Sequence, residues 1–151
     1  MQELTQKETS YLTDAKSHEQ LCIDKYNKYS NEAKAPELNS LFSQLAQKEQ
    51  GHFDTLNQLL GGTIPAMDLA KAPPSAITEP VVNQTQADKK SDQLLLKDSL
   101  EIEKKISSDY NTAIFEFKNT DIRNILNHIQ REEQEHGDEL YKYMAANGMY
   151  N

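Results

Sequence analysis

The most constraining feature of the sequence is a motif that occurs twice, with an offset of 84 residues. Each copy has a Glu, a second Glu 30 residues later, and a His three positions after that second Glu. Because residues i and i+3 share one face of a helix, each Glu-x-x-His can direct both side chains at one interior point. Two single Glu residues and two Glu-x-x-His motifs, one from each of four helices, form the ligand set of a di-metal site in a bundle core. The six candidate ligands are Glu19, Glu49, His52, Glu103, Glu133 and His136.

The similarity between the two halves extends beyond the motif. The 14 Glu and 4 His of the chain would give only about 0.4 Glu-x-x-His matches by chance. When residues 12–60 are aligned with 96–144, 12 of 49 positions are identical, against roughly 3 expected from average composition. The two halves are therefore related hairpins. A duplicated hairpin can persist for packing alone, so the repeat does not by itself establish a metal site.

The apolar residues predict four helices. They recur every three or four positions, which is the helical period, over about 6–34, 36–60, 89–118 and 119–147. The segment at about 61–88 holds four Pro residues among Gly, Ala, Ser and Thr, and is too long for a hairpin turn. A crossover that travels the length of the bundle explains it better than a flexible linker, because each hairpin alone would expose its apolar face. We expect residues 1–151 to form one all-α four-helix bundle, with hairpins at about 6–60 and 89–147.

The candidate ligands fall on or beside the apolar stripes of their helices. Glu49 follows Leu45 by four residues, and His52 precedes Leu56 by four. The alternative is that these side chains lie on solvated helix faces. Four carboxylates in a bundle core would be very costly without compensating cations. Carboxylates with one imidazole per ion suit Fe or Mn better than a thiolate-rich set, which favours structural Zn.

Two tyrosines repeat with the motif. Tyr26 and Tyr110 each lie seven residues, or two helical turns, after their Glu. A phenol in that place can hydrogen-bond a ligand carboxylate, or it can be an ordinary core tyrosine; both interpretations stay open. His18 and His128 have no His partner across the repeat, so we expect them at the surface. We also expect Glu101, Glu132 and Glu135 to be solvated charges.

Composition excludes several classes. A net charge of −8 and a pI near 5.0 argue against a nucleic-acid-binding face, which needs clustered basic residues. No stretch approaches 18 consecutive apolar residues, and the N-terminal residues lack the pattern of a signal peptide, so we expect neither a membrane span nor secretion. The single Cys22 suits a reducing compartment and is expected to be a small buried hydrophobe rather than a site residue. No nucleotide, flavin or haem is expected.

The second half contains further local sequence patterns: Glu103-Lys-Lys105, Tyr110-Asn-Thr-Ala-Ile114, Asn119-Thr-Asp-Ile-Arg-Asn124, Glu132-Glu-Gln134 and Gly148-Met-Tyr150. Over about 95–151 these patterns resemble the Coat F family of spore coat proteins. Over about 8–147 the chain resembles, more loosely, the ferritin-like superfamily that includes bacterioferritin and rubrerythrin. The lack of Cys-x-x-Cys pairs departs from rubrerythrin, and the shorter first hairpin and Pro-rich crossover depart from bacterioferritin.

The Coat F resemblance implies an endospore-forming bacterium and a protein of the mother-cell cytoplasm or the spore coat. It implies a structural, coat-associated or metal-binding role, with metal ions and either a homodimer or coat proteins as partners. The apparent retention of all six ligands favours two bound Fe or Mn ions. The alternatives are a di-iron or di-manganese oxidoreductase with peroxidase, oxidase or catalase-like activity, and a metal-free structural bundle.

Overall fold

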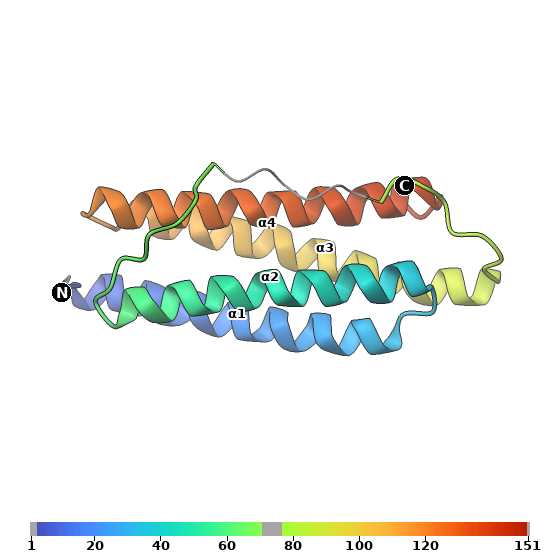
Figure 1. The fold of residues 1–151 in the computed structure, drawn as a ribbon, viewed down its shortest axis with the longest axis horizontal. Helices are drawn as coiled ribbons and strands as arrows, with labels where there is room; N and C mark the ends of the chain where they lie inside the picture. Colours follow the sequence, from blue (N-terminus) through green and yellow to red (C-terminus); the bar gives the residue numbers. More distant parts are fainter. Residues whose placement is uncertain (1–2, 71–76, 151) are drawn as a thin grey trace.

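The protein is a bundle of four long helices in a computed structural model that describes residues 3–70 and 77–150. The helices are α1 (Gln6–Glu32), α2 (Pro36–Leu60), α3 (Gln86–Ile114) and α4 (Thr120–Ala146), and the described residues contain no strand. Helices α1 and α2 are antiparallel, as are α3 and α4, whereas α2 and α3 run in the same direction (Figure 1). The predicted all-α four-helix bundle with two helical hairpins is confirmed.

Local sequence sets the helix ends. Thr5 and Glu8 form a capping box at the start of α1, where each side chain binds the backbone N–H of the other residue. Pro36 stands in the first turn of α2, where its missing N–H is not needed. Gly62 follows α2 with a φ of 85°, a left-handed conformation that glycine adopts without a Cβ clash.

The third helix begins and ends earlier than the predicted 89–118. Its start is moved to Gln86 because the Thr85 hydroxyl accepts a 3.1 Å hydrogen bond from the Asp88 N–H. Its end lies at Ile114, where the N–H of Phe117 donates back to the Ile114 carbonyl in a tight turn. The apolar character of Phe117 reflects burial in this turn, at 3% exposure, and not a continuing helix.

Each hairpin holds the turn of the other through a buried carboxylate. Glu8 on α1 accepts a 3.1 Å hydrogen bond from the Lys118 N–H in the α3–α4 turn. Asp92 on α3 accepts bonds of 2.7 Å from the Lys34 N–H and 3.1 Å from the Ala35 N–H in the α1–α2 turn. Glu8 and Asp92 are related by the 84-residue offset, as are Lys34 and Lys118. The pseudo-two-fold symmetry of the sequence therefore extends to the backbone hydrogen bonds of the turns.

The α2–α3 connection is the predicted crossover, of which residues 71–76, with Pro73 and Pro74, lie outside the described residues. On one side of this gap the Leu69 carbonyl accepts a hydrogen bond from Arg131, in the middle of α4. On the other side the Val81 N–H donates to the Asn147 side chain, just beyond the end of α4. The connection therefore follows α4 toward the start of α3 (Figure 1).

Away from the candidate ligands and the buried carboxylates that hold the turns, the interior is mainly apolar. Leu38, Phe42 and Ile129 are fully buried. Cys22 is 1% exposed, as predicted, and burial raises the pKa of its thiol. Among the helices of residues 3–70 and 77–150, none has the combination of length and apolar character that crossing a bilayer requires.

Candidate metal centre

All six predicted ligands lie inside the bundle. Helices α1 and α3 each contribute one Glu, and α2 and α4 each contribute a Glu-x-x-His, so the four helices converge on one point along the bundle. None of the six side chains faces solvent, which rules out the solvated-face alternative. Their exposed fractions are 0% for Glu19, Glu49 and Glu133, 2% for Glu103, 3% for His136 and 4% for His52.

The six side chains divide into two overlapping groups that share two carboxylates. In each group the four potential ligand atoms lie within 4.8 Å of one another. Glu49 and Glu133 belong to both groups, whereas each group has its own Glu and its own His. Glu49 and Glu133 are therefore the residues that could contribute to holding both of two neighbouring ions. The groups are Glu19, Glu49, His52, Glu133 and Glu49, Glu103, Glu133, His136.

The distances within the cluster repeat across the pseudo-two-fold axis. His52 Nδ1 lies 2.6 Å from Glu133 Oε1, and His136 Nδ1 lies 2.8 Å from Glu49 Oε1. His52 Nδ1 is also 3.7 Å from Glu19, and the equivalent His136–Glu103 distance is 3.6 Å. Each imidazole is thus closest to the shared Glu of the other hairpin, so the site requires both halves of the chain.

Most polar atoms of this cluster are buried without a hydrogen-bond partner. Both oxygens of Glu49 and of Glu133 are in this position, with one oxygen each of Glu19 and Glu103. The Nδ1 atoms of His52 and His136 are also unpartnered, because their close approaches to carboxylates lack hydrogen-bond geometry. Unpartnered buried polar atoms are costly. Eight such atoms gathered at one point fit the donor set of a pair of cations.

The two repeated tyrosines bind the two candidate ligands that are not shared. Tyr26 O–H donates a 2.5 Å hydrogen bond to Glu103, and Tyr110 O–H donates a 2.6 Å bond to Glu19. Each bond joins α1 to α3 across the pair of hairpins. Burial, with the negative charge of the neighbouring carboxylates, raises the pKa of both phenols. Both phenols therefore hydrogen-bond candidate-ligand carboxylates, which is the arrangement that the first of the two interpretations expects.

Burial and the charges of neighbouring side chains shift the pKa of several residues in the cluster. Burial and the charge of Glu49 raise the pKa of Glu19 to about 8. Burial and the surrounding carboxylates likewise raise the pKa of Glu133. Burial lowers the pKa of His136, but the negative charges of the adjacent Glu103 and Glu49 outweigh it and bring the pKa to about 10. The pKa of His52 is raised in the same way, with Glu133 as the largest opposing influence.

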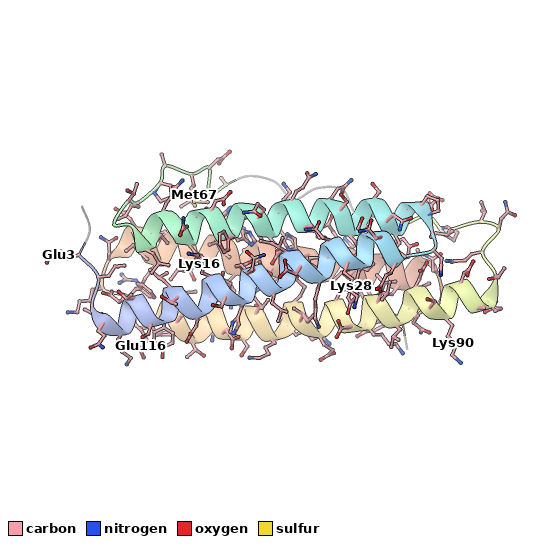
Figure 2. All side chains as sticks on the ribbon, turned by 90° about the horizontal axis from the view of Figure 1, so that it is seen from below. Glu3, Lys16, Lys28, Met67, Lys90 and Glu116 are labelled. Carbon is pink, nitrogen blue, oxygen red and sulfur yellow. The ribbon has the colours of Figure 1, made fainter. Side chains whose placement is uncertain are left out.

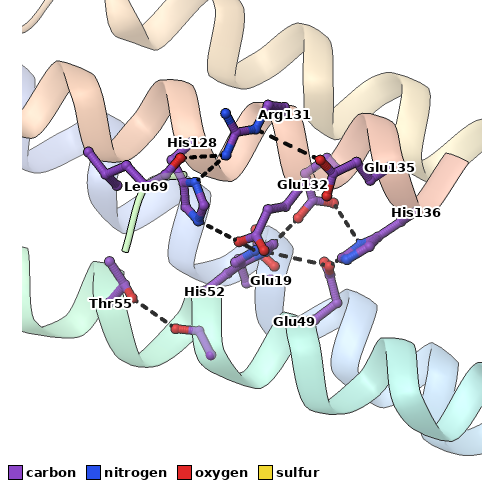
Figure 3. A network of polar contacts seen from close by, with 12 residues as sticks. Glu19, Glu49, His52, Thr55, Leu69, His128, Arg131, Glu132, Glu135 and His136 are labelled. Carbon is purple, nitrogen blue, oxygen red and sulfur yellow. Dashed lines mark hydrogen bonds and ion pairs between the residues drawn. The ribbon is translucent and has the colours of Figure 1, made fainter. Parts of the chain in front are cut away.

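A chain of polar contacts outside the ligand set reaches His52 from α4 (Figure 3). Glu132 Oε1 lies 3.0 Å from His52 Nε2 and 3.1 Å from His128 Nε2. Arg131 lies 3.1 Å from His128 Nδ1 and donates to the Leu69 carbonyl of the crossover at 2.6 Å. The prediction that His128 is a surface residue is wrong, because it is 7% exposed. The prediction that Glu132 is a solvated charge is also wrong, because its side chain is 19% exposed and bonded to two imidazoles.

This chain of contacts orients both imidazoles. Arginine can only donate, so His128 Nδ1 accepts, and the N–H at His128 Nε2 lies 3.1 Å from Glu132. His52 also presents Nε2 to Glu132, which leaves Nδ1 directed at the carboxylate cluster. Burial raises the pKa of Glu132, but the hydrogen bond and the positive charge of His52 outweigh it and hold the pKa at about 2. An ionised carboxylate behind a ligand histidine orients the ring and increases its basicity.

The contact between Glu132 and His52 has no equivalent in the other half. The residue 84 positions before Glu132 is Lys48, and the residue 84 positions before His128 is Gln44. An ammonium group cannot accept a hydrogen bond from His136. The two halves therefore supply the same candidate ligands, but only one half supports its histidine with a carboxylate.

The other residues predicted at the surface differ in exposure. The side chains of His18 and Glu101 are 41% and 74% exposed, whereas that of Glu135 is only 22% exposed.

Comparison with known protein families gives one match, in the C-terminal part of the chain. Residues 91–151 match the family model of the Coat F domain. This part of the chain is similar to the Coat F domain. It supplies Glu103, Tyr110, Glu133 and His136, whereas the other candidate ligands come from the N-terminal hairpin, outside the matched range. Searches of curated proteins and of solved structures gave no match. The Coat F resemblance inferred from local sequence patterns is confirmed.

Proposed function

We propose that this chain is a spore-coat-associated protein that binds two Fe or Mn ions between its N-terminal hairpin and its Coat F domain. The Coat F match supports the coat association. The metal proposal rests on one observation, the set of eight buried and unpartnered ligand atoms at a single point of the core. The six residues that would hold the ions are Glu19, Glu49, His52, Glu103, Glu133 and His136.

The donor set guides the choice of metal. Four carboxylates and two imidazoles supply hard oxygen and borderline nitrogen donors, which suit Fe and Mn. Cys22 is buried, but it belongs to neither group of converging ligand atoms. Thiolate-rich sets typical of structural Zn are therefore not formed by the described residues.

Metal analysis of the purified protein tests the proposal. The protein would be reconstituted anaerobically with Fe²⁺ or Mn²⁺, desalted, and analysed for bound metal. We expect close to two equivalents for the wild type and a large loss for the Glu49→Ala/Glu133→Ala double variant, which lacks both shared carboxylates. Glu101→Gln is the matched control, because Glu101 is a 74% exposed carboxylate near the ligand Glu103 on α3. Less than about half an equivalent in the wild type would refute metal binding and leave a metal-free structural bundle.

Coat association has its own test. A fluorescent fusion expressed in a sporulating host should collect at the spore surface late in sporulation. The double variant should still collect there if the coat role depends on the bundle surface rather than on the metal. A fusion that stays diffuse in the mother cell throughout sporulation would refute the coat assignment without affecting metal binding.

Redox catalysis at the same centre is the second candidate, favoured by the two carboxylates that both ligand groups share. Such a pair would hold two ions close together, and a bound pair supplies two-electron chemistry and Lewis acidity. Within this chain, Tyr26 and Tyr110 would hold the unshared carboxylates in place. Peroxide turnover by the metal-loaded wild type, lost in the Glu49→Ala/Glu133→Ala variant, would establish this function. Equal turnover by the two proteins would remove it.

A further inference from the structure

A small cavity opens between α1 and α3 and ends at one of the two tyrosines of the metal centre. Its volume is about 180 Å³, and its walls include Tyr11, Ala15, Ile106 and Ala113. Tyr110 also lines the cavity, and the hydroxyl of this residue donates to the candidate ligand Glu19. The cavity thus lies one side chain away from the ligand set, on the α1/α3 face that is seen in Figure 2.

The other half of the chain closes the equivalent place with a larger side chain. The residue 84 positions before Ala113 is Tyr29. Tyr29 packs against Phe42 with a ring-centroid distance of 5.8 Å, and its hydroxyl donates to Asp98. Lys25 adds an ion pair to Asp98 at 3.2 Å. The cavity exists at one end of the α1–α3 interface, here called the open end, because Ala113 has only a methyl group there. At the other end, the closed end, the phenol of Tyr29 fills the equivalent space.

The two ends of the α1–α3 interface also differ in charge, and the more negative end is the one with the cavity. The position equivalent to Lys25 is Asp109, which lines the cavity together with Asp14. Asp109 is paired with the exposed Lys105 at 3.2 Å and lies 3.4 Å from His18. The closed end therefore carries a Lys where the open end carries a second carboxylate. A cleft with carboxylates at its rim and apolar walls concentrates cations and speeds their arrival.

We propose that this cavity is the route by which a hydrated divalent cation reaches the ligand set. The inference rests on the proposed metal-binding function and adds the direction of approach. Asp14 and Asp109 attract the ion, the cavity has room for a few of its waters, and Tyr110 separates the cavity from Glu19. A cation that passes this point meets Glu19 first.

The association rate of Co²⁺ tests the route, because Co²⁺ is stable to air and its binding is followed by absorbance in stopped flow. Ala113→Tyr and Asp109→Lys each give the open end the residue of the closed end. Asp14 is available as an acceptor for the new phenol, as Asp98 is for Tyr29, and Asp109 is on the surface, so both variants should fold. We expect each variant to slow association roughly ten-fold. Calorimetry, which measures binding at equilibrium, should show that each variant still binds two Co²⁺ ions.

Lys25→Asp is the control at the closed end, where Tyr29 still fills the space, and its association rate should match the wild type. The effect of Asp109→Lys should shrink at high ionic strength, because exposed charges are screened, whereas that of Ala113→Tyr should not. Wild-type rates in both open-end variants would overturn the route, as would an equal change in Lys25→Asp. A wild type that binds no Co²⁺ in calorimetry would instead refute the proposed function.

Discussion

Metal binding to this cluster should release about four protons per pair of divalent ions at pH 7. The pKa of each of His52, His136, Glu19 and Glu133 is raised in the folded protein, to about 10 for His136 and to about 8 for Glu19. Each must lose its proton before it can donate to a metal. Electrostatics leads to the same number, because a buried site keeps its net charge only if each cationic charge that enters replaces a proton.

The sign of the pH dependence follows. Protons compete with the ions, so affinity rises with pH, by about ten-fold per pH unit for each proton released. The pH dependence of the metal affinity should be steepest below pH 8 and become weaker as Glu19 loses its proton at about pH 8 in the metal-free protein. It should weaken again near 10, where His136 is deprotonated in the metal-free protein.

Calorimetry in buffers of different ionisation enthalpy measures the protons directly. Mn²⁺ would be titrated into the protein at pH 7 in at least three buffers, and the slope of observed against buffer enthalpy gives the number released. Glu101→Gln should give the wild-type slope, because its carboxylate is exposed. Binding of two ions with release of one proton or none would refute the protonation scheme and the burial argument behind it.

Three further predictions follow from the structure. Glu132→Gln should weaken one of two metal-binding steps about 10- to 100-fold in calorimetry, whereas Lys48→Gln should change neither step, because only Glu132 supports a ligand histidine; equal effects would contradict the asymmetry. Gly51→Ala should raise stability to urea by about 0.5–1 kcal/mol, because a Cβ at this helical position meets no atom within 4 Å; a lower midpoint would show an unseen contact. Asp92→Ala should lower stability by about 1–3 kcal/mol by removing the acceptor of two turn N–H groups, and no loss would mean that water replaces it.

The repeat made the fold and the ligand positions predictable. Helical spacing places Glu49 and His52 on one face, and an 84-residue copy of the pattern supplies the opposing helix. The residues that the prediction missed are those that break the repeat. Glu132 and His128 have Lys48 and Gln44 as counterparts, so a search for symmetry assigned them to the surface. Their position depends on how closely α4 approaches α2, which spacing along one helix does not encode.

The spacing from His128 to Glu132 did contain a usable signal. The two residues are four apart and therefore share a helix face, and Glu132 directly precedes a predicted ligand. The cavity beside Ala113 could also have been suspected, because the repeat replaces a Tyr with an Ala there. The helix boundaries at 86 and 114 depended on side-chain caps and on a tight turn, which compete locally with the apolar pattern.

The reciprocal turn contacts of Glu8 and Asp92 have an evolutionary consequence. Each hairpin donates one carboxylate to the other hairpin's turn and accepts one in return. The same exchange holds for the tyrosines and for the histidines of the cluster. Such self-complementary pairing is the geometry of a two-fold symmetric dimer. A single ancestral hairpin could therefore have assembled the whole centre from two identical copies. In that case, fusion through the crossover would have allowed Glu132, Lys48, Tyr29 and Ala113 to diverge from their counterparts.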